Sequence, residues 1–122
     1  MKALVMIAHG SRRREANAEF IALVKSVKAD AGAKYDFVDY CFLEIAVPSL
    51  VETVEHVIAK GATTIYILPY FLNSGRHVLR DIPEIVARLT NQYPHLAITL
   101  FPCFGTFEGI ATLISRQVPS KT

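Results

Sequence analysis

The chain has 122 residues, of which 52% are hydrophobic, and its formal net charge at pH 7 is only +2. This length suits one typical domain, and the small charge, without an aromatic-basic RNA-binding motif, argues against a nucleic-acid partner. No apolar run approaches the roughly 20 residues that span a bilayer, and the N-terminus lacks the sections of a signal peptide. We therefore expect a single domain over residues 1–122 that is soluble, cytoplasmic and not bound to a membrane.

Short apolar runs alternate with longer amphipathic ones about four times along the chain, which predicts a βαβαβαβα order. The predicted strands are residues 2–8, 35–44, 63–72 and 97–101. The predicted helices are residues 15–31, 48–60, 82–93 and 107–118.

Individual residues support these assignments. Residues 2–8 are almost continuously apolar, as in a central parallel strand that is covered on both faces. Asp36 and Asp39 make the second strand more polar, which suits the edge of a sheet. Pro48 and Pro83 are expected in the first turns of their helices, where a missing N–H is harmless.

This order predicts a three-layer α/β domain with a four-stranded parallel sheet of flavodoxin type and strand order 2-1-3-4. Right-handed crossovers place all the carboxyl ends of the strands at one edge, and ligands bind there where the strand order reverses. The loops expected at this edge begin at His9, Glu44, Asn73 and Pro102.

His9 and His77 would therefore flank the reversal point, with Glu44 beside His9. Two imidazoles and a carboxylate can hold a divalent transition metal while leaving coordination positions open. Each residue also has a simpler interpretation, as a loop or helix-capping histidine or as a solvated carboxylate. His56 lies within a polar helix face and His95 in a turn away from this edge, so we expect both at the surface.

A run of three arginines, Arg12, Arg13 and Arg14, begins the first predicted helix, where cations oppose the helix dipole. The run is either a solvated face or the rim of an anion site. Arg76 and Arg80 would extend such a rim, since guanidinium groups match carboxylate geometry. Cys41 and Cys103 form no C-x-x-C pair, so we expect reduced thiols with packing roles.

Several segments together resemble the small class II tetrapyrrole chelatases, the sirohydrochlorin cobaltochelatases and ferrochelatases. They are Ala8-His9-Gly10-Ser11-Arg12 with Ala16, Asn17 and Phe20, then Phe42-Leu43-Glu44, and Leu68-Pro69-Tyr70-Phe71-Leu72 continuing through Ser74-Gly75-Arg76-His77-Val78 to Asp81-Ile82-Pro83. The resemblance covers essentially the whole chain, and the segment around the third strand is its most specific part.

The resemblance implies insertion of Co²⁺, Fe²⁺ or Ni²⁺ into sirohydrochlorin without ATP, in cobalamin or sirohaem biosynthesis. It implies a homodimer, because longer family members contain two such units. It also implies that His9 and His77 bind the metal, that Glu44 assists them, and that no cofactor is permanently bound. The candidate substrate contacts are Ser11, Arg12, Arg13, Tyr70, Phe71, Leu72, Ser74, Gly75, Arg76, Arg80 and Phe104.

The residue types suit this chemistry. A neutral imidazole binds such ions exchangeably, and a histidine that titrates near the working pH can accept a pyrrole proton. Glu44 would orient a histidine or accept protons onward. Two alternatives are a carrier of metal or tetrapyrrole without turnover and a histidine phosphatase, although Ala8 stands where a phosphatase has arginine. Neither the P-loop nor the dinucleotide-binding glycine pattern occurs in the chain.

Overall fold

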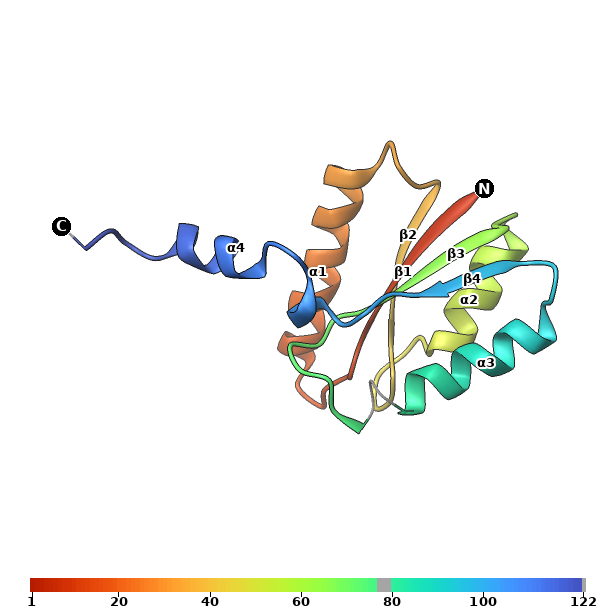
Figure 1. Ribbon diagram of the computed structural model, residues 1–122. Helices are drawn as coiled ribbons and strands as arrows, with labels where there is room; N and C mark the ends of the chain where they lie inside the picture. The colour runs from red at the N-terminus through yellow and green to blue at the C-terminus, as the bar shows by residue number, and fades with distance from the viewer. Residues whose placement is uncertain (77–79, 122) are drawn as a thin grey trace.

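A parallel four-stranded sheet with the order β2-β1-β3-β4 is the centre of the computed structural model, which describes residues 1–76 and 80–121 (Figure 1). The strands are β1 (Lys2–Ala8), β2 (Phe37–Phe42), β3 (Thr64–Pro69) and β4 (Ala97–Leu100). The helices are α1 (Arg14–Ala31), α2 (Leu50–Ala59), α3 (Ile82–Gln92), the 3₁₀ turn η2 (Phe104–Thr106) and α4 (Ile110–Gln117). This strand order confirms the order 2-1-3-4 that was predicted from the sequence.

Strand β1 lies between β2 and β3, and its alternating side chains separate two apolar clusters. Ala3, Val5 and Ile7 point to the face that α2 and α3 cover, where Val54 and Ile82 are fully buried. Each of these three residues of β1 is completely inaccessible to solvent, as expected of a strand covered on both faces.

Helix α1 covers the opposite face. Leu4 and Met6 of β1 contact the cluster that contains Phe20 and Val24 of α1 and Phe42 of β2. The rings of Phe20 and Phe42 meet edge to face, with centroids 5.7 Å apart. Helices on both faces of the sheet give the three layers that the sequence predicted.

The structure corrects the start of the second helix. Pro48 precedes the helix instead of lying in its first turn, because Ser49 caps α2. The Ser49 hydroxyl accepts a hydrogen bond from the Glu52 N–H at 3.1 Å, and the Glu52 carboxylate accepts one from the Ser49 N–H at 2.9 Å. These bonds satisfy two backbone donors and lower the pKa of Glu52. Pro83, by contrast, lies in the first turn of α3 as predicted.

Three further boundaries differ from the prediction. Strands β2 and β3 are shorter than residues 35–44 and 63–72. Single backbone hydrogen bonds from Leu43, Glu44 and Tyr70 continue toward β1 beyond these two strands. The last helix begins at Ile110 instead of Phe107, and η2 forms ahead of it.

Both cysteines are buried and unpaired, which confirms the packing role expected for them. Burial raises the pKa of the Cys41 thiol well above its usual range, so this thiol stays protonated. Among the described residues, no helix has the length and apolar character needed to cross a membrane.

Replacing Ser49 with Ala should lower the free energy of unfolding by about 1 kcal/mol, the usual cost of losing an N-cap. Urea unfolding of S49A and of the parent chain measures the difference. A loss near zero would mean that the capping box does not stabilise α2. Ser26, which lies exposed on α1, provides the matched control as S26A.

Candidate functional site

His9 and Glu44 form an ion pair at the carboxyl edge of the sheet. Atoms His9 Nε2 and Glu44 Oε1 are 2.8 Å apart, and the two side chains are 41% and 50% exposed. His9 follows β1 and Glu44 follows the neighbouring strand β2. The structure therefore places in direct contact two candidate residues that the sheet topology predicted to lie close together.

Backbone hydrogen bonds continue the ladder past the strand ends and fix this pair. The Leu43 N–H donates to the Ala8 carbonyl at 2.8 Å, and the Glu44 N–H donates to the His9 carbonyl at 3.1 Å. Ala8 also pairs in register with Phe42. The two side chains thus leave adjacent, hydrogen-bonded backbone segments instead of mobile loops.

Gly10 allows the loop from β1 to pass close to the loop from β2. Its φ of +99° lies in the left-handed region, and a Cβ at this position would overlap the carbonyl oxygen of Glu44. The sequence analysis left Gly10 out of the candidate site. The position of this glycine, directly after a histidine at a strand end, could have indicated that another backbone segment passes close to it.

Asn17 holds the loop between β1 and α1. Its side-chain oxygen accepts a hydrogen bond from the Ser11 N–H at 3.0 Å, and its amide donates to the Ser11 carbonyl at 2.8 Å. The Ser11 hydroxyl accepts a bond from the Arg13 N–H at 3.0 Å. Ser11 therefore has a structural role in this loop, whatever contact it makes with a substrate.

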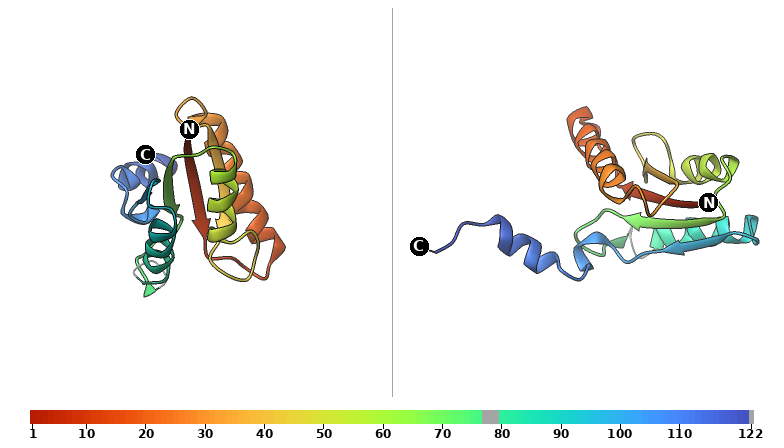
Figure 2. Two further views of the ribbon diagram at one scale, coloured as in Figure 1. Left: turned by 90° about the vertical axis from the view of Figure 1, so that its right-hand side faces the viewer. Right: turned by 90° about the horizontal axis from the view of Figure 1, so that it is seen from above.

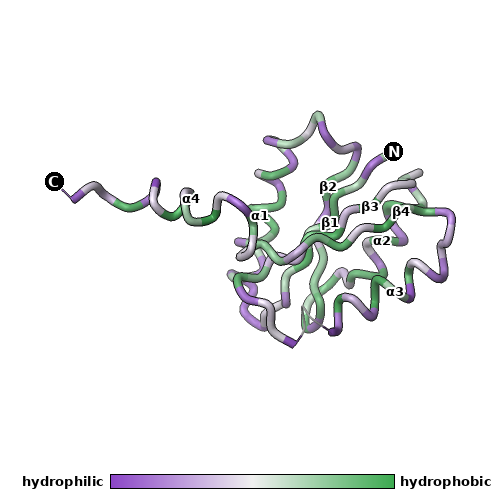
Figure 3. Tube along the Cα trace, viewed as in Figure 1, coloured by the Kyte–Doolittle hydropathy of each residue, from purple (hydrophilic) through white to green (hydrophobic). Residues whose placement is uncertain are grey.

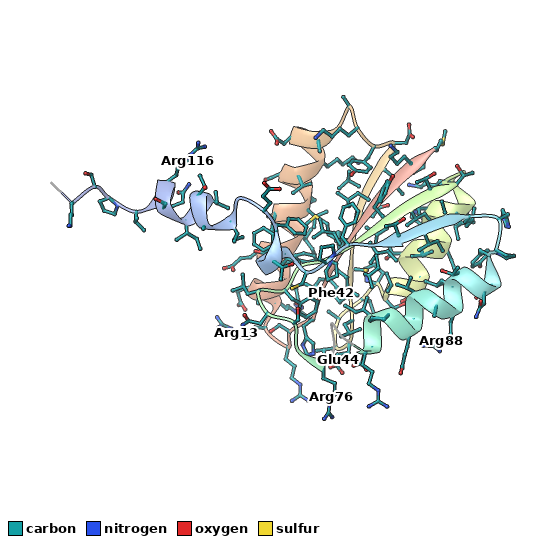
Figure 4. All side chains as sticks on the ribbon, in the orientation of Figure 1. Arg13, Phe42, Glu44, Arg76, Arg88 and Arg116 are labelled. Carbon is teal, nitrogen blue, oxygen red and sulfur yellow. The ribbon has the colours of Figure 1, made fainter. Side chains whose placement is uncertain are left out.

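Cationic side chains surround the same end of the molecule. Figure 4 shows Arg13, Glu44 and Arg76 extending from this end, and Arg12, Arg13 and Arg76 are all exposed. Arg80 forms an ion pair with Glu84, with Nε and Oε1 3.5 Å apart, although both side chains remain mostly exposed. Since exposed pairs of this kind are weak, Arg80 can exchange this partner for another carboxylate.

The four apolar residues expected to contact a ring system line one hollow of about 160 Å³. They are Tyr70, Phe71, Leu72 and Phe104. The Tyr70 ring contacts Phe104 in a tilted arrangement, with centroids 5.3 Å apart, and stacks on Phe20 at 5.4 Å. Leu72 is 69% exposed, so it offers the most open apolar surface of the four.

Two further exposed apolar residues follow Glu44, and the sequence analysis did not single them out. Ile45 has a φ of +72°, an uncommon conformation for a β-branched residue, and its side chain is 57% exposed. Val47 is 79% exposed. Strained backbone and exposed apolar side chains beside an ion pair are typical of a functional site.

Of the remaining predicted site residues, the structure describes Ser74 and Gly75 but not His77. Ser74 Oγ lies 3.4 Å from Cys103 Sγ, and Gly75 is exposed with open space around it. His77 lies outside the described residues. Within residues 1–76 and 80–121, no three His, Cys, Asp or Glu side chains gather closely enough to hold a metal ion.

His56 and His95 are exposed, as predicted.

The arrangement can move a proton, and it can bind a metal ion if one ring nitrogen of His9 exchanges its oxygen partner for the ion. Nε2 of His9 faces a carboxylate oxygen, and Nδ1 lies 3.2 Å from the Gly10 carbonyl. Imidazole with a hydrogen-bonded carboxylate is the usual form of a metal-binding histidine, and the carboxylate can also accept a proton from the ring.

A doubly wound parallel sheet with a His–Glu pair at its carboxyl edge defines an α/β protein whose ligand site is built on strand ends. Within that class, the chain belongs to the CbiX family, whose model matches residues 3–121.

Known relatives agree with this membership. A sirohydrochlorin ferrochelatase from Priestia megaterium is 30% identical over 97% of this chain and 44% of its own length. A sirohydrochlorin cobaltochelatase from Methanococcus aeolicus is 40% identical over 70% of this chain and 59% of its own length. The structure of the sirohydrochlorin chelatase SirB from Bacillus subtilis subspecies spizizenii, in complex with cobalt, superimposes with a TM-score of 0.82 at 29% identity. The superposition covers 94% of this chain and 48% of SirB. The chain thus spans roughly half the length of several relatives.

Replacing Gly10 with Ala should destabilise the protein by about 2 kcal/mol, because the new Cβ is strained at positive φ and overlaps the Glu44 carbonyl. Urea unfolding measures this loss. G75A is the matched control, since a Cβ there meets nothing within 4 Å, and it should change stability by less than about 0.5 kcal/mol. Equal effects of the two variants would contradict the close approach of the two loops.

Proposed function

We propose that this protein inserts a divalent transition metal into sirohydrochlorin without ATP, with Co²⁺ or Fe²⁺ as the first candidates and Ni²⁺ as a further one. The observation that carries the proposal is the His9–Glu44 pair, which lies at the edge of the sheet that also carries the apolar hollow and the arginines. Membership of the CbiX family and the names of the relatives support the same reaction.

In this proposal, His9 and His77 deliver the metal ion. Imidazole nitrogen binds these ions firmly enough to remove some of their water, but it exchanges fast enough to release them to the ring. A thiolate site would hold the ion more tightly, and the two cysteines of this chain are buried away from solvent.

Insertion also requires the ring to lose two pyrrole N–H protons as the four nitrogens close around the ion. His9 is positioned to accept such a proton once the metal has left it, and Glu44 accepts it onward through the 2.8 Å contact. The two released protons balance the two positive charges that the metal brings into the ring.

The tetrapyrrole has a flat apolar body and carboxylate side chains at its margin. Leu72, together with Ile45 and Val47, offers exposed apolar surface for the body. Arg12, Arg13, Arg76 and Arg80 are the cations proposed to bind the carboxylates. One such edge covers only part of a macrocycle, so a second copy of the chain would cover the rest, and we propose a homodimer.

The direct test is an anaerobic absorbance time course with excess sirohydrochlorin, catalytic protein and each metal in turn, corrected for spontaneous insertion. The proposal predicts many products per subunit with at least one of Co²⁺, Fe²⁺ and Ni²⁺. At most about one product per subunit would identify a carrier instead, and no acceleration with any metal would reject the chelatase.

Two substitutions assign the roles within the pair. H9A should lower kcat by on the order of 10²-fold or more, because it removes both a ligand and a proton acceptor. E44Q should lower it by roughly 10-fold to 100-fold, because the amide keeps the shape but cannot take a proton. H95A, at an exposed histidine in a distant turn, is the matched control and should keep the parent rate. Parent rates in folded H9A would contradict the assignment.

A further inference from the structure

The 3₁₀ turn η2 lies against the segment that follows β3, residues 70–72, which forms most of the apolar hollow. The Gly105 N–H donates a hydrogen bond to the Phe71 carbonyl at 2.9 Å, and the Phe104 and Tyr70 rings are in contact. Figures 1 and 2 show η2 beside this segment, and Figure 3 shows that both emerge from the hydrophobic centre of the molecule. The shape of the hollow therefore depends on how η2 sits on the segment after β3.

Gly105 makes the closest contact between these two segments. A Cβ on this residue would overlap the carbonyl oxygen of Leu72 and lie 2.7 Å from its Cα. Because the overlapped atoms belong to the backbone, a change of side-chain rotamer cannot relieve the overlap. The φ of Gly105 lies outside the left-handed region, so close approach alone requires a glycine here. A larger residue would have to move residues 70–72 away from η2.

Further contacts hold η2 in place. The Thr106 hydroxyl and N–H both donate to the Cys103 carbonyl, at 2.7 and 3.0 Å. The Cys103 Sγ lies 3.4 Å from the Ser74 Oγ, just beyond the segment. Gly109, with a φ of +92°, then turns the chain outward into α4. The turn thus keeps its shape through its own bonds, and it contacts the chain on both sides of Leu72.

A similar contact holds the other candidate loop, where Gly10 packs against the Glu44 carbonyl. Gly10 lets two loops approach each other so that the His9–Glu44 pair forms. By the same geometry, Gly105 lets η2 and the segment after β3 approach each other so that the hollow forms. The side chain of Leu72, the residue whose carbonyl meets Gly105, is left 69% exposed. The two glycines therefore serve different parts of the site.

We propose that Gly105 is a positioning residue for tetrapyrrole binding. It allows η2 to hold residues 70–72 where the hollow and the Leu72 side chain receive the apolar body of the ring. This inference rests on the chelatase proposed above and separates ring binding at the hollow from the metal and proton chemistry of His9 and Glu44. Gly105 thus affects how tightly the tetrapyrrole binds, and not how fast the metal enters a bound ring.

Steady-state kinetics test this division. G105A should raise the KM for sirohydrochlorin by about 10-fold and change kcat by less than about 3-fold, because it displaces a binding surface and leaves the ion pair in place. G10A, which strains the other loop, should instead lower kcat. A fall in kcat without a rise in KM for G105A, or parent values of both, would overturn the proposal.

V57A is the control for lost stability. Val57 is fully buried, and its carbonyl accepts the Ala62 N–H at 2.9 Å at the amino end of β3, far from the hollow. Truncating it should cost about 2 kcal/mol of unfolding free energy. The KM and kcat of V57A should match the parent values, and a KM raised as much as in G105A would overturn the proposal.

Labelling of the two cysteines tests the contact itself, in the absence of tetrapyrrole and metal. Cys103 is 2% exposed and lies beside Ser74, whereas Cys41 is fully buried in the core. If G105A moves the segment off η2, N-ethylmaleimide should label Cys103 on the order of 10-fold faster than in the parent chain, while Cys41 keeps its rate. Mass spectrometry of the peptides measures both rates. A variant that only destabilises the fold exposes both cysteines together, so equal acceleration or none would overturn the proposal.

A milder variant answers the question if G105A does not fold. T106V removes the hydroxyl bond to the Cys103 carbonyl with little change in side-chain size, and it should raise both KM and Cys103 labelling by about 3-fold. Parent values in folded T106V would then overturn the proposal. Absence of turnover in the parent chain, with selective labelling of Cys103 in G105A, would reject the chelatase but support the role of Gly105 in placing the segment.

Discussion

The parallel register of three adjacent strands is the constraint on which the candidate site depends. Ala8 pairs with Phe42 on one side of β1, and Ile7 pairs with Pro69 on the other, so the three strands end at the same level. His9 and Glu44 therefore emerge side by side. A shift of one residue in either pairing would turn side chains to the other face and separate the ion pair. Alternate residues of β1 pack into two different apolar clusters, and this packing holds the register on which the site depends.

Much of this arrangement could be predicted from the sequence, because hydrophobic periodicity and crossover handedness are strong rules. They predicted the strand order, the edge position of β2 and the proximity of His9 to Glu44. The prediction of Pro48 as a first-turn residue was wrong, since a serine cap outweighs proline's preference for that position. His77, which lies outside the described residues, and the contacts with a tetrapyrrole remain predictions.

Three features could not be read from the pattern because they depend on contacts between distant segments. Gly10 matters through its contact with the Glu44 backbone, and Ile45 through its positive φ. The outward course of α4 follows from the anchoring of η2 and the turn at Gly109. Periodicity correctly indicated an amphipathic helix near the end of the chain, but it says nothing about where that helix lies relative to the sheet.

X-ray absorption at the cobalt edge, on protein loaded with Co²⁺ alone, tests most directly whether the His9–Glu44 edge receives the metal. The account predicts nitrogen and oxygen neighbours with the outer-shell scattering of imidazole, reduced in H9A and unchanged in H95A. A sulfur shell, or an identical spectrum in H9A, would place the metal elsewhere and contradict the account.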